Sequence, residues 1–291
     1  MAEQTLRIMG KGGKIVKLMK KLKTNPKGFL GFIILLVYVG MALFADIIST
    51  HDPNEIVPED RLLPPSFKHF FGTDQYGRDI FSRVVHGSRI SIYVGSLSSL
   101  IALVLGTTMG LLAGYYRGYI DEVISRFIDV LLAFPALLLA ILIAAILGPN
   151  LFNLCVIIGV VYMPQFTRIV RASVLSLREK EFVLAARAAG DRDFTVMFSE
   201  ILPNAIAPLI VQTSITFAFA ILTEASLSFL GLGIPPPTPA WGSMLYDARG
   251  YIEFAPWMTI APGMAIFLAV FGFNTFGDGL RDILDPRLKV D

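Results

Sequence analysis

The chain has 291 residues and a formal net charge of +2; 54% of its residues are hydrophobic, 16% are charged, and one is cysteine. A soluble domain carries about a quarter charged residues, so this composition excludes an ordinary soluble protein. The small net charge comes without a basic patch interleaved with aromatic residues, which argues against a nucleic-acid-binding protein. The single cysteine, Cys155, has no partner for an intrachain disulfide or a thiolate metal cluster.

Residues 1–27 form a basic segment before the first long apolar run. Within it, Ile15, Leu18, Met19 and Leu22 recur at helical spacing among lysines. This pattern predicts a short amphipathic helix on the anionic cytoplasmic leaflet, and a disordered basic tail is the alternative. The apolar run that follows is too long for a secretory signal peptide and lacks a clear cleavage site. We therefore expect it to be the first transmembrane helix, over residues 28–48.

Six apolar segments in all are close to the ~20 residues that a membrane-spanning helix requires. Several contain proline, which spanning helices tolerate when neighbouring helices satisfy the freed backbone groups. The sequence thus predicts an all-α polytopic membrane protein with six transmembrane helices, in which residues 90–277 form a five-helix core. The expected spans are roughly 28–48, 90–116, 127–147, 151–175, 204–230 and 256–276.

Lys and Arg predict the orientation of these spans. Basic residues gather in the N-terminal segment, after the second span, after the fourth span and in the tail, residues 278–291. With six spans, these four stretches share one side of the membrane, and the positive-inside rule makes that side cytoplasmic. Both termini are therefore expected in the cytoplasm, and residues 49–89 form an extracytoplasmic loop.

The loop over residues 176–203, between the fourth and fifth spans, has a helical pattern of its own. We expect Gly190 to end this short helix, because glycine accepts the left-handed backbone of a helix C-terminus. Asp191 or Asp193 is expected to cap the next helix. The residues alone leave two interpretations, a helix resting on its own bundle or the lipid and a docking element for a soluble partner. One narrow apolar face at helical spacing is formed by Phe182, Ala185, Ala186 and Ala189.

This loop resembles the EAA loop of ABC importer permeases, whose pattern is Glu-Ala-Ala, three residues, Gly, nine residues, Ile-x-Leu-Pro. Leu184 and Glu200 depart from that pattern, at the positions of its Glu and Ile. Residues 71–83, with a Gly-Thr-Asp-x-x-Gly-Arg-Asp core, and residues 273–286 resemble the dipeptide and oligopeptide permease C subunits, a likeness that runs from about Lys20 onward. The residues that match the EAA pattern are Ala185, Ala186, Gly190, Leu202 and Pro203.

The resemblance implies a type I ABC importer permease bundle in the bacterial cytoplasmic membrane, moving dipeptides or oligopeptides. It implies pairing with a second homologous permease, two ATP-binding subunits that hold ATP and Mg, and an extracytoplasmic substrate-binding protein. Nickel or another small solute is the alternative cargo, because nickel permeases share this family. The resemblance also implies that the ATPase-coupling residues are Glu181, Phe182, Ala185, Ala186, Ala189, Gly190 and Asp191.

The outer-loop motif lies just before the second span. Its glycines suit turns, and Asp74, Arg78 and Asp79 are expected to form an ion-pair latch at the membrane surface. A structural clamp that orients the loop is favoured over direct contact with substrate. The residues of the motif are Gly72, Thr73, Asp74, Gly77, Arg78 and Asp79.

Other functions find less support in the sequence. The three histidines all precede the second span, and the chain has no His-Glu-x-x-His motif, no Gly-x-Ser-x-Gly elbow and no P-loop. An enzyme is therefore not expected, and ATP hydrolysis must come from another chain. An ion-coupled carrier usually has repeats and several buried carboxylates, whereas Glu224 is the one candidate here. We expect Glu224 to have a structural role, near the outer interface or paired with a neighbouring helix.

Overall fold

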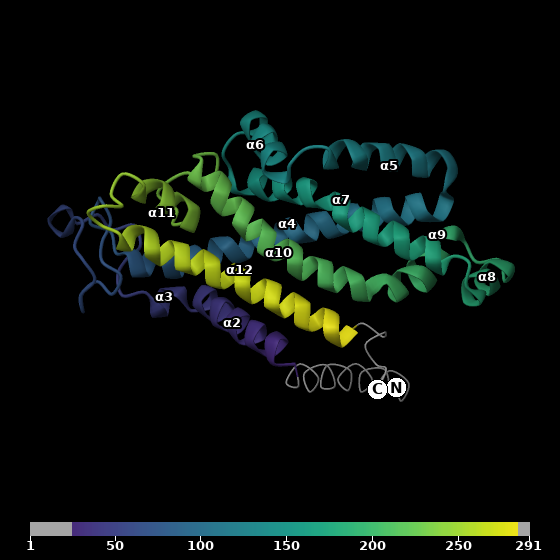
Figure 1. The fold of residues 1–291 in the computed structure, drawn as a ribbon, viewed down its shortest axis with the longest axis horizontal. Helices are drawn as coiled ribbons and strands as arrows, with labels where there is room; N and C mark the ends of the chain where they lie inside the picture. The colour runs from purple at the N-terminus through teal and green to yellow at the C-terminus, as the bar shows by residue number, and fades with distance from the viewer. Residues whose placement is uncertain (1–24, 285–291) are drawn as a thin grey trace.

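The computed structural model describes residues 25–284, so the predicted basic surface helix around residues 15–22 and the last residues of the tail lie outside it. Within this range the regular elements are helices, and one isolated antiparallel bridge pairs Thr73 with Asp79 in the loop before α4. They form the elongated bundle of Figure 1. The α-helices are α2 (Pro26–Leu43), α3 (Ala45–Ile48), α4 (Ile80–Tyr116), α5 (Gly118–Leu132), α6 (Ala136–Leu147), α7 (Leu151–Leu177), α8 (Glu181–Ala188), α9 (Asp193–Thr195), α10 (Ile206–Phe229), α11 (Trp241–Ala248) and α12 (Trp257–Leu284). Shorter 3₁₀- and π-helical segments are Pro58–Asp60, Val196–Ile201 and Leu202–Ala205.

Five of these helices are long and apolar enough to cross a membrane, or up to six if one bent pair counts as a single span. That pair is α5 and α6, which meet at 93°. The third span predicted over 127–147 is therefore interrupted, with its first residues in α5 and the rest in α6. Pro135 explains the break, because proline has no N–H to donate and disfavours helical backbone at the residue before it.

Two helices extend beyond the apolar runs that predicted them. The start of α4 lies ten residues before position 90, because the Asp79 carboxylate accepts a hydrogen bond from the Ser82 amide (2.8 Å) and caps the helix there. At the other end of the chain, α12 continues to Leu284, so the segment expected as a tail from residue 278 begins as helix. Hydropathy marks where a helix meets lipid, and both extensions carry charged residues.

A stripe of small residues joins α4 and α7. Gly106, Gly110 and Gly114 recur every four residues along α4 and face α7. A Cβ added to Gly110 would lie 2.7 Å from the Cβ of Val170 and 2.7 Å from the carbonyl oxygen of Thr167. Such small-residue spacing lets membrane helices approach closely. The two helices form the centre of one apolar core, and the sequence analysis above did not single out this spacing.

A second apolar core joins α2, α10, α11 and α12. There the Tyr38 hydroxyl donates to the Ala265 carbonyl (2.6 Å), and the buried Trp241 donates to the Val84 carbonyl (2.9 Å).

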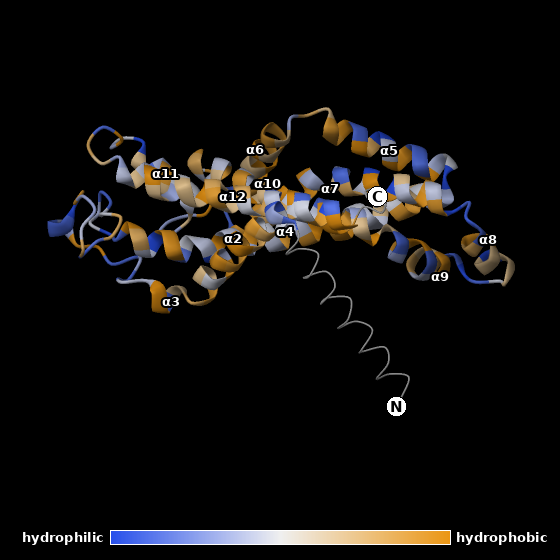
Figure 2. Cartoon of the chain, turned by 60° about the horizontal axis from the view of Figure 1, so that its bottom comes forward, coloured by the Kyte–Doolittle hydropathy of each residue, from blue (hydrophilic) through white to orange (hydrophobic). Residues whose placement is uncertain are grey.

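The bundle has two distinct ends: one holds the loop before α4 together with α11, and the other holds α8 and α9 (Figure 1). Figure 2 shows apolar residues along the middle of the helices and hydrophilic residues gathered in the loops at both ends.

Candidate functional site

Helix α8 is attached to the bundle by one side chain above all. Val183 is fully buried and belongs to the core formed by α4 and α7, and Ala186 packs partly against that core. The expected apolar face therefore needs a correction, because Ala186 turns toward the bundle rather than away from it. Val183, one helical turn before Ala186, is the anchor that the pattern of small residues did not reveal.

The opposite side of α8 is apolar and uncovered. Ala185, Ala188 and Ala189 are exposed there, flanked by Phe182 at 40% exposure and Leu184 at 49%. We call these five residues the α8 docking face. Figure 1 places α8 at the tip of the bundle, beyond the ends of α4 and α7. The side chains of Ala185, Ala188 and Ala189 are small enough that another protein surface could approach the helix backbone closely.

The turn after α8 confirms one expectation and corrects another. Gly190 has a φ of +89°, the left-handed conformation expected at a helix C-terminus, and the Asp191 amide donates back to the Ala186 carbonyl (3.1 Å). Neither aspartate caps the next helix, since Arg192 occupies the position before α9 and makes no side-chain capping bond. Asp193 instead accepts a hydrogen bond from the Tyr115 hydroxyl (2.6 Å).

Tyr115, at the end of α4, contacts the chain on both sides of α8. The guanidinium of Arg187 lies 4.6 Å from the centre of its ring, and Arg178, just after α7, donates to its carbonyl oxygen (2.9 Å). Together with Asp193 these contacts fix α8 to the ends of α4 and α7.

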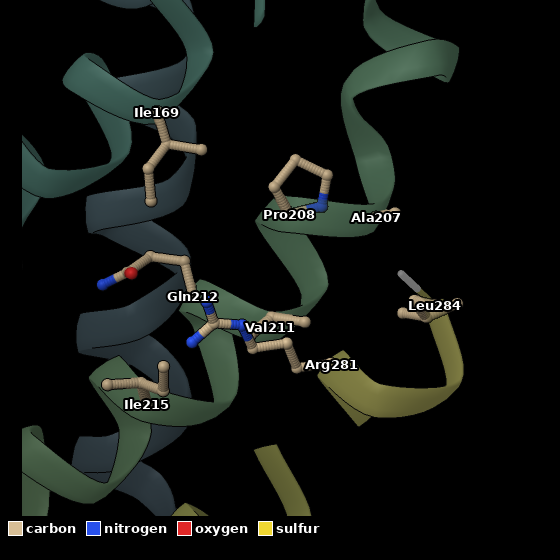
Figure 3. A pocket seen from close by; sticks show the side chains of 8 residues that line it. All are labelled: Ile169, Ala207, Pro208, Val211, Gln212, Ile215, Arg281 and Leu284. Carbon is tan, nitrogen blue, oxygen red and sulfur yellow. The ribbon is translucent and has the colours of Figure 1, made fainter. Parts of the chain in front are cut away.

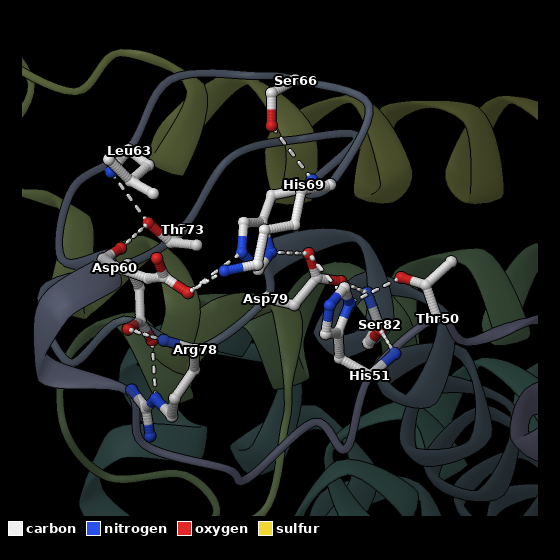
Figure 4. A network of polar contacts seen from close by, with 12 residues as sticks. Thr50, His51, Asp60, Leu63, Ser66, His69, Thr73, Arg78, Asp79 and Ser82 are labelled. Carbon is white, nitrogen blue, oxygen red and sulfur yellow. Dashed lines mark hydrogen bonds and ion pairs between the residues drawn. The ribbon is translucent and has the colours of Figure 1, made fainter.

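The outer-loop motif forms a buried polar network at the opposite end (Figure 4). The Arg78 Nε atom lies 2.6 Å from the Asp74 carboxylate, and both side chains are buried, which confirms that part of the expected latch. Asp79 belongs to a different pair: its Oδ1 lies 2.9 Å from Nδ1 of His69. The hydrogen bond from Lys68 holds the pKa of Asp60, beside His69, below its usual value.

The backbone of this motif also matches the expectation of turns. Gly72 and Gly77 have φ values of +74° and +79°. A Cβ at Gly77 would clash with the carbonyl of Val57, so side chains are excluded there as well as strained. The hydroxyl of Thr73 accepts from the Leu63 amide (2.8 Å). The motif thus orders the outer loop, as a clamp would.

Replacing Arg78 by Met is expected to destabilise the protein by about 2 kcal/mol, because the buried Asp74 carboxylate loses its nearest cation and keeps Arg83, whose Nε lies 3.9 Å away. The measurement is thermal or denaturant unfolding of the purified chain in detergent. Arg61→Met, a change at an exposed arginine of the same loop, is the matched control and should have little effect. Equal stability of the two variants would contradict the latch.

Glu224 lies inside the bundle, fully buried near the end of α10. It accepts a hydrogen bond from Ser228 of the same helix (2.8 Å), and its Oε2 has no hydrogen-bond partner among the described residues. The expected partner on a neighbouring helix is therefore not found among the described residues, and a position near the outer interface stays a prediction.

A cavity of about 400 Å³ lies between α7, α10 and α12, on the α8 side of the bundle. Its two polar side chains are Gln212 and Arg281, and Figure 3 shows Arg281 extending from α12 toward Gln212 on α10. Gln212 donates to the side-chain oxygen of Gln165 on α7 (2.8 Å). The sequence did not single out Gln165 and Gln212; polar residues scattered along apolar helices are the only signal for them.

Comparison with known proteins gives consistent results. Residues 106–290 match the family described as the binding-protein-dependent transport system inner membrane component, and residues 16–65 match the N-terminal transmembrane domain of oligopeptide transport permease C. The chain is 50% identical over 270 residues to the dipeptide transport system permease protein DppC of Alkalihalophilus pseudofirmus, covering 93% of this chain and 89% of that one.

Two further similarities extend this picture. The chain is 46% identical to the di/tripeptide transport system permease protein DppC of Pseudomonas aeruginosa, covering 91% of this chain and 90% of that one. Among solved structures, an inward-facing MetNI methionine ABC transporter matches with a TM-score of 0.59 at 18% identity, covering 71% of this chain and 98% of the other. At that identity the structural match speaks for the fold alone.

Proposed function

Because the chain belongs to the binding-protein-dependent transport system inner membrane component family, we propose that it is the membrane-spanning permease subunit of an ATP-driven importer of peptides. The resemblance to peptide permeases found in the sequence is confirmed by relatives that carry such names over nearly the whole chain. The family is one of transport permeases, which accords with the expectation that the chain is not itself an enzyme.

The observation that carries this proposal is the α8 docking face. The three exposed alanines at the centre of this face let a partner protein approach the helix backbone closely, and Phe182 and Leu184 at its edges add apolar contact. The partner is an ATP-binding subunit, which supplies the ATP and Mg. Residues Phe182, Ala185 and Ala189 make the contact, Gly190 sets the turn, and Glu181 and Asp191 lie at its edges.

Coupling follows from how α8 is held. Nucleotide favours the closed pair of ATPase subunits, and this differential affinity biases the permease between its two states. The motion enters at α8 and reaches α4 through Tyr115, Arg178 and Arg187. Helix α4 has 37 residues and so spans about 55 Å at 1.5 Å per residue. It begins at Asp79 in the outer-loop network, so one rigid helix links the two ends.

The orientation places α8 and both termini in the cytoplasm. The positive-inside rule supports that assignment, because Lys and Arg are dense in residues 1–27 and in the loop over residues 176–203. The loop before α4 then faces outward, where a substrate-binding protein delivers the peptide. Counting the bent α5–α6 pair as one span gives six spans and is consistent with termini on one side.

A second homologous permease completes the pathway. The cavity near Gln212 and Arg281 lies between helices of one chain, and these two polar side chains stand in an otherwise apolar lining. Peptides are favoured over nickel or another small solute because relatives with 46–50% identity are named for di- and tripeptides. A secondary transporter is less favoured, because such a carrier usually has several buried carboxylates. Glu224 is the one carboxylate that is buried within the described spans.

Co-purification tests this assignment. The tagged chain, extracted from its host in mild detergent, should bring down a second permease and two ATP-binding subunits. A bound extracytoplasmic protein that binds di- or tripeptides would support the peptide cargo, and one that binds nickel would replace it. Recovery of the chain alone, in the detergent that preserves a related importer, would contradict the proposal.

A further inference from the structure

Two histidines and an aspartate meet in the outer loop although they lie far apart in the sequence. One ligand atom from each of His51, His69 and Asp79 lies within 4.8 Å of the other two. Asp79 Oδ1 is 2.9 Å from His69 Nδ1 and 3.8 Å from His51 Nδ1, and the two imidazole rings stack at 4.7 Å between centres. Figure 4 shows the three side chains converging beside the first turn of α4.

This spacing suits a divalent metal ion. Zn²⁺ binds imidazole nitrogen at about 2.0–2.1 Å and carboxylate oxygen at about 2.0–2.2 Å, and tetrahedral ligand atoms are then roughly 3.3 Å apart. The two distances to Asp79 Oδ1 bracket that value, and the three ligand atoms lie within 4.8 Å of one another, so the ligands must draw closer by up to about 1.5 Å to hold one ion. The Thr50 hydroxyl, 2.9 Å from His51 Nδ1, would have to turn aside.

The surrounding groups orient two of these ligands. The second oxygen of Asp79 accepts from the Ser82 amide, which leaves Oδ1 directed at the histidines. His69 is almost fully buried, and its Nε2 has no hydrogen-bond partner among the described residues, although Asp60 Oδ2 lies 3.5 Å away. A histidine between a metal and a carboxylate is the usual arrangement around metal-bound imidazoles.

A fourth ligand position is accessible from outside. A cavity of about 220 Å³ opens beside the cluster, and its charged lining is Asp52, Glu55 and the ion pair of Asp60 with Lys68. The His51 side chain is 30% exposed. The carboxylates attract cations to this cavity, and water can complete a tetrahedral site.

We propose that the outer loop binds one divalent transition-metal ion through His51, His69 and Asp79, with Asp60 orienting His69. Two imidazoles and one carboxylate with an open position are donors typical of Zn²⁺ and related first-row ions. The ion would join the segment after α3, the middle of the outer loop and the N-terminus of α4. This site belongs to the chain whatever solute it transports, and it is distinct from the polar side chains around Gln212.

The test uses the full-length purified chain without a polyhistidine tag, freed of metal with a chelator and titrated with Zn²⁺ alone. We expect one Zn²⁺ per chain by calorimetry and by metal analysis after dialysis. Co²⁺ in place of Zn²⁺ should give the intense visible bands of four-coordinate cobalt with nitrogen and oxygen ligands. Absence of stoichiometric Zn²⁺ binding would overturn the proposal and leave the cluster as ion pairs only.

Variants locate the ion. His51→Ala removes a partly exposed ligand and should weaken Zn²⁺ binding at least ~100-fold, while Asp60→Asn should weaken it roughly 10- to 100-fold by releasing His69. His86→Ala is the matched control: this third histidine lies near Asp46 instead and its loss should leave binding unchanged. If His51→Ala and Asp60→Asn both bind Zn²⁺ as tightly as the unmodified chain, the ion is bound elsewhere and the assignment to this cluster is wrong.

Discussion

Replacing Ala185 by Asp is expected to abolish ATP-driven uptake while leaving the chain folded and inserted. Ala185 lies at the centre of the α8 docking face and is exposed, so a carboxylate there costs nothing in the isolated subunit. Once an ATPase subunit covers the face, the charge is buried without a partner. Such a charge costs on the order of 3 kcal/mol, which weakens docking roughly a hundredfold. Uptake of labelled dipeptide and retention of the ATPase during purification both measure this loss.

Ala185→Ser is the matched control, because it adds a polar atom at the same position without charge or bulk. It should retain most uptake and most bound ATPase. Normal uptake in the Ala185→Asp variant would show that the α8 docking face does not meet the ATPase. Ala186 is a poorer choice for this test, since it packs partly against the bundle and a charge there would disturb the fold itself.

Gly110→Leu is expected to prevent the packing of α4 against α7. The first carbon of the new side chain would lie 2.7 Å from both Val170 and the Thr167 backbone, where neither can move aside without separating the helices. We expect a destabilisation above about 3 kcal/mol, at the upper end for overpacking. Little monodisperse protein should be recovered in detergent.

The control for this prediction is Gly263→Leu on α12, where an added Cβ would meet nothing within 4 Å. It introduces the same side chain into another long helix of the bundle and should leave recovery and unfolding temperature close to those of the unmodified chain. Equal losses in both variants would mean that leucine is harmful in these helices for reasons other than the α4–α7 contact.

Much of the fold was predictable because each spanning helix must be apolar over its whole length. The apolar runs located α2, α7, α10 and α12 to within a few residues at most ends. They failed where another force decides the structure. Pro135 breaks the third run through its missing N–H, and the Asp79 cap starts α4 in a charged stretch that hydropathy does not count as membrane.

The candidate site was predictable where it depends on local geometry. Gly190 and the position of α8 follow from the short-range pattern of the loop. The burial of Val183 depends on contacts with helices far away in sequence, and no local pattern separates it from the exposed Leu184. The cluster of His51, His69 and Asp79 was missed for the same reason, since only the folded loop brings positions 51 and 69 together.

The most direct test of the central claim is peptide uptake into liposomes by the purified assembly. The liposomes carry the second permease and the ATPase subunits, with ATP inside the vesicles and the binding protein outside. We predict that labelled dipeptide accumulates inside and that accumulation stops when ATP is omitted. The same assembly built with Ala185→Asp should not accumulate it. Accumulation by this chain alone, without ATPase subunits or ATP, would contradict the account and identify a carrier instead.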